Sequence, residues 1–494
     1  MEASGLRVLR EWDSDLRGGD PLTFPGYAAQ VREAAVESVR TGLTDVAGQP
    51  AVLIEATFSV FGGTMGVAAG EKVVRAFDRA AAGGLPVVAV TASGGVRLQE
   101  GMLALTQMAR TAAARRRHAA AGLLMAAVYQ QPTTGGVYAS WAGLADVRAA
   151  ISGATIGFGG PRVVQAVTGQ APPATSHTAE SAYAAGHVDA VLSEADQAGW
   201  ISAVLGGAIL PLVLPAWRRP VAAYPGSADP AGGWAAVTAA RAPDRPSGLE
   251  WAAALCSSWT DLHGRDPAIR AGLATLAGGR AVVIAMDRHA RADAAARPGP
   301  AGYRLAQRAI RLAGQLGLPL LTLVDTPGAE PGPAAEEDGI ATEIAETLAL
   351  MADLPTVSVC LVVGEGGSGG AMALGYADRL YMLAGSVFPV IAPEAAAVIL
   401  HRDPALAPPL AGALGLTGAD LRRLGLVSGV LPDDGASAGD VRSAIGAAFG
   451  AARPGDRASR ADRATRCWLT GTDLSAASRR PGSHEPRPDR QCAW

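Results

Sequence analysis

The stretch LPVVAVTASGGVR, residues 85–97, decides the fold, because the chain repeats its pattern as LPLLTLVDTPGAE at residues 318–330. In both stretches a short, continuous apolar run ends in a turn that contains glycine. Short apolar runs rich in β-branched residues are typical of strands that lie buried between layers in α/β proteins. The pair therefore predicts two equivalent buried strands, each followed by a glycine turn.

The repeat extends beyond these strands, with its segments in the same order in both halves of the chain. A glycine-to-glycine spacing is also kept: Gly94 to Gly135 and Gly328 to Gly369 are both 41 positions (135 − 94 and 369 − 328). Three further pairs of segments match: GEKVVRAFDRAA (70–81) with GYRLAQRAIRLA (302–313), PTTGGVYAS (132–140) with EGGSGGAMA (365–373), and LADVRAAISGATIGFGGP (144–161) with YADRLYMLAGSVFPVIAP (376–393).

The duplication predicts an α/β protein of two tandem domains, which suits a chain of 494 residues. We expect the first domain at 1–209, a Pro/Gly-rich linker at 210–234 and the second domain at 235–452. Residues 453–494 are rich in Arg, Pro, Ser and Asp and show little apolar periodicity, so we expect them to be mobile.

Composition excludes several classes of protein. A net charge of −3 does not favour nucleic acid or a membrane surface as a partner. No apolar run is long enough to span a bilayer, and the acidic N-terminus is unlike a signal peptide, so we expect a cytoplasmic protein. The cysteines lie far apart without C-x-x-C spacing, which predicts neither a zinc site nor a disulfide framework: Cys256, Cys360, Cys467 and Cys492.

The stretch GEGGSGG, residues 364–370, matches the G-x-G-x-x-G fingerprint of dinucleotide-binding proteins. That fold needs an acidic residue about 20 positions later, where this chain has Ala384 and its neighbours, none of them acidic. The equivalent turn in the first half lacks the first and third fingerprint glycines. We therefore do not predict a nucleotide site here.

Paired glycine turns can instead bind an anion with the main chain. Glycine lets the backbone approach a ligand closely, and the N–H groups at a helix start have no acceptor within the helix. Two such turns that converge would point N–H donors at one oxygen, forming an oxyanion hole. The sequence contains no G-x-S-x-G or H-E-x-x-H motif, and its seven histidines are dispersed, so main-chain chemistry on an enolate-like anion is favoured.

At these residues the chain resembles the carboxyltransferase of the bacterial multisubunit acetyl-CoA carboxylase. Segments of residues 15–205, among them ASGGVRLQEGMLALTQMART and QPTTGGVYAS, resemble its β subunit. Segments of residues 230–430, among them LVDTPGAEPGPAAEEDGIATEIAETLALMADL and VVGEGGSGGAMALGYADRL, resemble its α subunit. The resemblance implies a β–α fusion made of two crotonase-like (ββα spiral) domains, with the family's four-cysteine zinc ribbon absent and no zinc expected.

The resemblance also implies a division of labour between the halves. The β-type half would bind acyl-CoA and hold the thioester oxygen as acetyl-CoA becomes an enolate, through Gly94, Gly95, Gly135 and Gly136. The α-type half would hold the ureido oxygen of carboxybiotin, through Gly328, Gly369 and Gly370. Biotin's carboxyl group leaves as CO2, the biotin nitrogen takes the α-proton, and the enolate attacks the CO2 to give malonyl-CoA. The alternative is that these glycines serve tight turns and close packing.

Some polar residues are open to two interpretations. Arg97 and Arg162 either contact CoA phosphates or stabilise the turns, while Glu100 and Glu365 are candidates for orienting the loops. The arginine-rich run at 110–118 is interpreted as a solvated helix end.

The chain's single lysine bears on its partners. Lys72 lies at a predicted helix start rather than in the Met-Lys-Met hairpin of a biotin carrier, so the chain is not its own carrier. The resemblance therefore implies a separate biotin carboxyl carrier protein and a biotin carboxylase, and a homodimer in which one chain's first half meets the other's second half. The remaining alternatives are a malonyl-thioester decarboxylase and a non-catalytic scaffold, and the sequence does not choose between fatty-acid and polyketide biosynthesis.

Overall fold

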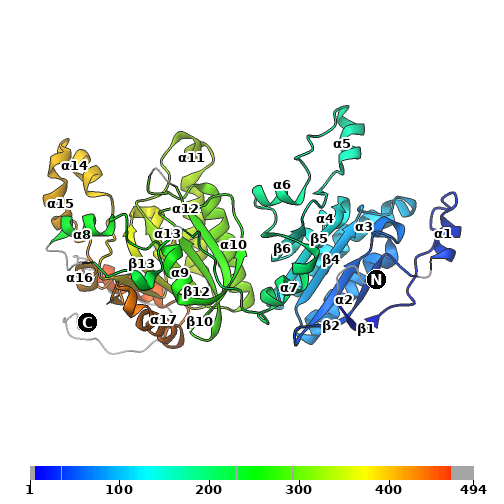
Figure 1. Ribbon diagram of the computed structural model, residues 1–494, viewed down its shortest axis with the longest axis horizontal. Coiled ribbons are helices and arrows are strands. Elements are labelled where there is room, and N and C mark those ends of the chain that lie inside the picture. The colour runs from blue at the N-terminus through cyan, green and yellow to red at the C-terminus, as the bar shows by residue number, and fades with distance from the viewer. Residues whose placement is uncertain (1–5, 35, 217, 228–231, 292–293, 469–494) are drawn as a thin grey trace. The chain divides into compact units, whose positions relative to one another are not determined.

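The first part of the chain is built on one sheet (Figure 1). The strand order of this sheet is β1-β2-β3-β4-β5-β6-β8, and β7 pairs with β5. The computed structural model describes residues 6–34, 36–216, 218–227, 232–291 and 294–468. Strands from β3 to β8 run parallel, and β1 and β2 join antiparallel. The strands are β1 (Val8–Trp12), β2 (Val39–Val46), β3 (Gln49–Ala56), β4 (Val87–Ser93), β5 (Met125–Thr134), β6 (Val147–Ile151), β7 (Ile156–Gly157) and β8 (Ala190–Leu192). The helices are α1 (Tyr27–Glu33), α2 (Val67–Gly83), α3 (Gly101–Ala120), α4 (Gly135–Tyr138), α5 (Pro161–Thr168), α6 (Ala179–Ala184) and α7 (Gln197–Leu205).

The second sheet has the order β15-β14-β13-β12-β11-β10-β9. It is parallel from β12 to β15, and β9 pairs antiparallel with β10. Its strands are β9 (Cys256–Leu262), β10 (Ile269–Leu276), β11 (Gly279–Met286), β12 (Leu320–Thr326), β13 (Ser358–Gly366), β14 (Arg379–Leu383) and β15 (Gly429–Leu431). The helices are α8 (Gly233–Ala240), α9 (Gly248–Leu255), α10 (Pro300–Leu316), α11 (Pro333–Glu337), α12 (Ile340–Asp353), α13 (Ser368–Gly375), α14 (Pro393–His401), α15 (Ala407–Ala413), α16 (Gly418–Arg423), α17 (Ala438–Ala451) and α18 (Asp456–Arg466).

The predicted repeat is present in the structure. The quoted strands are β4 and β12, each seven residues long and buried throughout, and the helices before them, α2 and α10, are each 17 residues long. Both helices end at a glycine in the left-handed conformation, Gly84 (φ 62°) and Gly317 (φ 65°). An α/β fold with two equivalent halves is therefore confirmed.

Apolar spacing explains how α2 packs. Ala69, Val73 and Phe77 recur every four residues and are fully buried, so they form one face of the helix. Phe77 meets Trp141 edge to face, with ring centroids 6.3 Å apart. Burying an aromatic side chain of this size contributes about 1.5–3 kcal/mol, so this face fixes α2 and the turns near it.

The contacts between its residues divide the chain into two compact units. One unit takes the chain up to Pro215 with 256–284 and 298–319, and the other takes 216–255, 285–297 and the chain from Leu320 on. Within the first unit, Arg308 of α10 donates to both carboxylate oxygens of Asp189 at 2.7 Å. The units do not follow the sequence ranges that we expected for the domains, and those domain boundaries stay a prediction.

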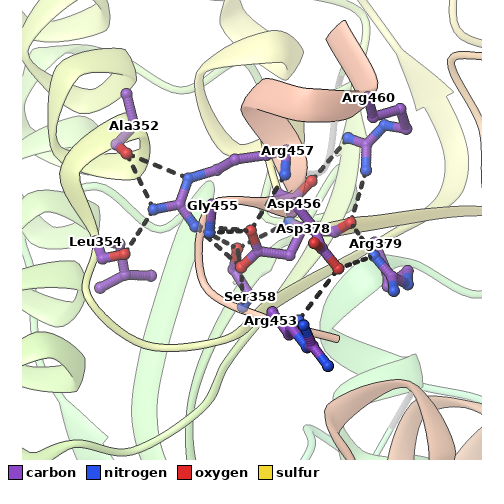
Figure 2. A network of polar contacts seen from close by, with 11 residues as sticks. Ala352, Leu354, Ser358, Asp378, Arg379, Arg453, Gly455, Asp456, Arg457 and Arg460 are labelled. Carbon is purple, nitrogen blue, oxygen red and sulfur yellow. Dashed lines mark hydrogen bonds and ion pairs between the residues drawn. The ribbon is translucent and has the colours of Figure 1, made fainter. Parts of the chain in front are cut away.

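The segment after Arg453 differs from the sequence-based expectation of a mobile tail, because residues 456–466 form α18. Figure 2 shows how Arg457 reaches Asp378, with Nη1 3.0 Å and 2.9 Å from its two carboxylate oxygens. Arg457 also donates to the main-chain oxygens of Ala352 and Leu354. A buried ion pair cannot be read from apolar periodicity, which is why the sequence missed this helix. The rest of the expected tail, 469–494, lies outside the described residues.

None of the helices in the described part of the chain is both long enough and apolar enough to cross a membrane.

Candidate active site

The first pair of glycine turns converges, as the sequence predicted. Gly95 follows β4 and Gly135 opens α4, and both have positive φ, 116° and 61°. A Cβ on Gly135 would lie 2.9 Å from the Cα of Gly95, and one on Gly95 would lie 3.0 Å from the amide nitrogen of Gly136. Glycine is therefore needed for the two backbones to approach this closely.

Most of the predicted donors of the first pair already donate to acceptors of the protein itself. The amide of Gly94 donates to Gly62 O (2.9 Å), that of Gly95 to Ser93 Oγ (3.0 Å) and that of Gly135 to Phe158 O (3.0 Å). These three glycines build the turns. Gly136 is different, because it is the second residue of α4, where N–H groups lack an acceptor within the helix.

Val96 provides a second candidate donor of the first pair, and the sequence did not predict it. Met65 N–H donates to Gly95 O (2.8 Å), and Arg97 N–H donates to Met65 O (3.0 Å), so the carbonyl before Val96 and the amide after it form this bridge. In extended backbone, successive N–H groups point to opposite sides, and the Val96 amide faces away from Met65. No acceptor within the described residues takes it. The alternating direction of the N–H groups in the extended segment after β4 is the signal that could have revealed this donor.

The second pair of turns repeats this construction. Gly328 follows β12 with φ 133°, and its amide donates to Thr326 Oγ1 at 3.1 Å, as Gly95 does to Ser93. The turn packs on Gly367, where a Cβ would lie 2.2 Å from the carbonyl carbon of Pro327. Gly367 was not among the predicted site residues, although this contact leaves no room for a Cβ and so requires glycine.

The second candidate donor pair consists of two amides that follow Gly328 and Gly367 in the sequence. Ser368 donates to Pro389 O at 3.1 Å, so Gly369, the second residue of α13, is the counterpart of Gly136. A Cβ on Gly369 would meet nothing within 4 Å, which leaves room for a ligand. Ala329 corresponds to Val96, and no acceptor among the described residues takes its amide. Gly370 is the buried third residue of α13.

The structure corrects the register of the repeat by one residue. The shared hydrogen bonds and positive φ angles pair Gly95 with Gly328, and they pair Gly136 with Gly369. Both spacings are again 41 positions (136 − 95 and 369 − 328). The sequence instead paired Gly94 with Gly328, because adjacent glycines make the two alignments indistinguishable by spacing.

Two of the three fingerprint glycines in the GEGGSGG stretch have packing roles. A Cβ on Gly364 would lie 2.1 Å from the guanidinium carbon of Arg245, and one on Gly366 would lie 2.8 Å from the ring of Phe388. These two glycines therefore serve close packing around β13, whereas Gly369 is the candidate donor.

Arg97 is buried behind the first turn, with 1% of its surface exposed. It forms an ion pair with Glu37, and its Nη2 donates to Ser38 Oγ and Thr64 O, both at 2.9 Å. Burial favours a raised pKa for the Glu37 carboxyl, but the hydrogen bond and charge of Arg97 outweigh it and the pKa is lowered. Of the two interpretations for Arg97, the geometry supports the one in which it stabilises the turn.

Glu100 holds other parts of the same loop. Its carboxylate accepts from Tyr27 Oη and from the amide of Val67, each at 2.5 Å. Burial, with this hydrogen bond, raises the pKa of Tyr27 to about 12, so the phenol stays protonated and donates. In the other unit Glu365 accepts from Arg241 Nε at 3.0 Å. Both carboxylates therefore orient loops at the turns, as the sequence suggested.

Two further predictions concern Arg162 and the arginine-rich run at 110–118. Arg162 lies exposed on α5, and a contact with CoA stays a prediction. In the run at 110–118, Arg117 is exposed but Arg115 is 2% exposed and paired with Asp146 at 2.7 Å. That run is therefore only partly a solvated helix end.

Two family models match the chain. "Carboxyl transferase domain" matches residues 20–247, and "Acetyl co-enzyme A carboxylase carboxyltransferase-like" matches residues 231–450. A Salinispora arenicola protein described as acetyl-coenzyme A carboxylase carboxyl transferase subunits beta/alpha is 42% identical, covering 84% of this chain and 77% of its own. The chain belongs to the carboxyltransferase subunits of biotin-dependent acyl-CoA carboxylases.

Other relatives of this carboxyltransferase have different names. The probable biotin-dependent acyl-coenzyme A carboxylase beta3 subunit of Mycobacterium bovis is 35% identical, covering 85% of this chain and 86% of its own. Membership in a biotin-dependent family confirms the predicted dependence on biotin.

Solved structures show the same fold. Transcarboxylase 12S, crystallised with methylmalonyl-coenzyme A and methylmalonic acid, aligns with a TM-score of 0.73 at 20% identity, over 91% of this chain and 88% of that one. A single-chain long-chain acyl-CoA carboxylase aligns with a TM-score of 0.67 at 20% identity, over 89% of this chain and 44% of that one. The predicted crotonase-like fold of the carboxyltransferase is confirmed.

Lys72 of the carboxyltransferase lies within α2 with 2% of its surface exposed, and burial lowers its pKa. A lysine that carries biotin must reach another protein, so this position agrees with a separate carrier. Within the described residues, no group of three or more His, Cys, Asp or Glu side chains could hold a metal ion.

Proposed function

We propose that this carboxyltransferase moves the carboxyl group of carboxybiotin to acetyl-CoA or another short acyl-CoA and so forms malonyl-CoA or its homologue. The observation that carries the proposal is the duplicated pair of turns. Each has two amides without an acceptor among the described residues, Val96 with Gly136 and Ala329 with Gly369. Two anion sites of the same construction suit a reaction with two oxygen anions, one on each substrate.

In the first unit, the amides of Val96 and Gly136 are assigned to the thioester oxygen of acyl-CoA. Charge develops on this oxygen when the α-carbon loses its proton, and fixed donors stabilise that charge without reorganising. Gly94, Gly95 and Gly135 hold the turns, and Arg97 fixes the loop from behind.

In the second unit, the amides of Ala329 and Gly369 are assigned to the ureido oxygen of carboxybiotin. The open space around Gly369 and the exposed start of α13 fit a ligand presented by a carrier protein. Gly370 helps to shape this helix start. The proposal requires no side-chain base, because the nitrogen of biotin takes the α-proton, as the family resemblance implies.

The proposed partners are a biotin carboxyl carrier protein, a biotin carboxylase and a second copy of this chain, in the cytoplasm. Apolar side chains exposed where α3 begins support the second copy, since exposed apolar patches mark interaction surfaces. They are Leu98 (80% exposed), Met102 (71%), Leu103 (50%) and Leu105 (43%).

The test is reconstitution of the chain with a biotinylated carrier, a biotin carboxylase, ATP and labelled bicarbonate, across acetyl-, propionyl- and butyryl-CoA. We expect label in the carboxylated thioester, with a preference among the three that names the substrate. Loss of CO2 from malonyl-CoA without biotin, and no carboxylation with it, would instead identify a decarboxylase. A folded chain without either activity would identify a scaffold.

A further inference from the structure

A guanidinium that has no part in the proposed function lies beside the second glycine turn. Arg297 comes from the loop between β11 and α10, and its Nη1 donates to Pro327 O at 3.3 Å. The same nitrogen lies 3.3 Å from the position that a Cβ would take on Gly328. Because Gly328 has no side chain, the guanidinium rests directly over the turn.

The charge of Arg297 is not neutralised by an ion pair with any described carboxylate. Other arginines of this region have carboxylate partners: Arg245 pairs with Asp325 at 2.7 Å, and Arg291 lies 3.8 Å from Glu330. The side chain of Arg297 is half-buried, so water screens its charge only in part. An anion bound at the turn is therefore the natural partner of this cation.

We propose that Arg297 binds the anion at the second glycine turn and donates to the ureido oxygen of carboxybiotin together with the amides of Ala329 and Gly369. The inference rests on the proposed function. When the bond between the biotin nitrogen and the carboxyl carbon breaks, its electron pair moves into the ureido group, and CO2 leaves. A hydrogen bond from a cation to the oxygen of that anion is stronger than one from an amide.

The stabilisation by Arg297 grows as negative charge develops on the oxygen, so it acts on the rate of transfer more than on binding. We expect Arg297→Met to lower the single-turnover rate of carboxyl transfer from a carboxylated carrier by about 10- to 100-fold. The dissociation constants for the biotinylated carrier and for acetyl-CoA should each change less than about 3-fold. Arg297→Lys keeps the charge and should recover part of the rate, and guanidinium ion added to Arg297→Ala should restore activity.

Arg291→Met is the matched control, because Arg291 is 51% exposed on the same loop and faces Glu330. It should transfer at the wild-type rate. Thermal unfolding midpoints of all variants report on folding, and the lysine variant keeps the test valid if the methionine variant is unstable.

The inference is overturned if Arg297→Met transfers at the wild-type rate, or if its loss lies in carrier binding and guanidinium does not rescue. Failure of the proposed function looks different, because the wild-type chain itself would then transfer no carboxyl group.

Discussion

At the scale of single residues, Gly95 and Gly135 let the first two turns meet, because their backbones approach each other more closely than a Cβ would allow. Spacing and composition located Gly95 and Gly135, since glycines recur in the same order in both halves. Which amide points toward a ligand depends on the path of the backbone, which sequence spacing does not encode. Val96 and Ala329 were missed for that reason, because a donor amide can belong to any residue type.

Gly135→Ala should abolish most activity, whereas Gly94→Ala should not. A Cβ at Gly135 lies 2.9 Å from the Cα of Gly95 in a left-handed backbone, so it pushes the two turns apart. Misplacing one donor costs about 100- to 1,000-fold in rate. A Cβ at Gly94 comes no closer than 3.5 Å to its neighbours, which is ordinary contact. Steady-state carboxylation rates check this, and equal losses in both variants would contradict it.

The ion pair behind the first turn should make stability depend on pH. The pKa of Glu37 is lowered in the folded chain, so its contribution is full above the unfolded value of 4.5 and is lost as pH falls below it. At pH 7, Glu37→Gln should be less stable than the wild type by about 1–3 kcal/mol, because Arg97 loses one of its two carboxylate partners and keeps Glu100. Urea unfolding should show this difference shrinking below pH 4.5, and a difference independent of pH would disprove the assignment.

At the scale of elements, apolar periodicity predicted the strands and helices around the turns well. β4 and β12 are continuous apolar runs, and α2 and α10 carry one apolar face each. α18 was not predicted, because its attachment to the unit rests on a polar contact. Its buried anchor, Arg457, has 2% of its surface exposed in an otherwise polar helix.

Arg457→Met should therefore destabilise the chain strongly. Asp378 is fully buried, and removing the cation leaves its charge without an ionic partner, at a cost of about 3–5 kcal/mol. Arg463→Ala is the control on the same helix, since Arg463 is exposed. Urea unfolding should separate the two variants, and a near-zero effect for both would show that α18 does not anchor the fold.

At the scale of the whole molecule, the proposed function assigns a different substrate to each half of the duplication. Gly135→Ala should impair the use of acyl-CoA but leave the release of CO2 from the carboxylated carrier. Gly367→Ala should impair that release itself, because a Cβ there lies 2.2 Å from the carbonyl carbon of Pro327 and displaces the second turn. The amount of labelled CO2 that each variant releases from the carboxylated carrier without acyl-CoA distinguishes Gly135→Ala from Gly367→Ala. Identical losses of this release in both variants would contradict the division of labour.

The most direct test of the two anion sites is a single turnover, in which a carboxylated carrier with a labelled carboxyl group is mixed with the chain and acetyl-CoA. We predict labelled malonyl-CoA from the wild type, and a rate lower by about 100-fold or more in Gly135→Ala and in Gly367→Ala. Undiminished transfer in both folded variants, or no transfer by the folded wild type to any short acyl-CoA, would contradict the account.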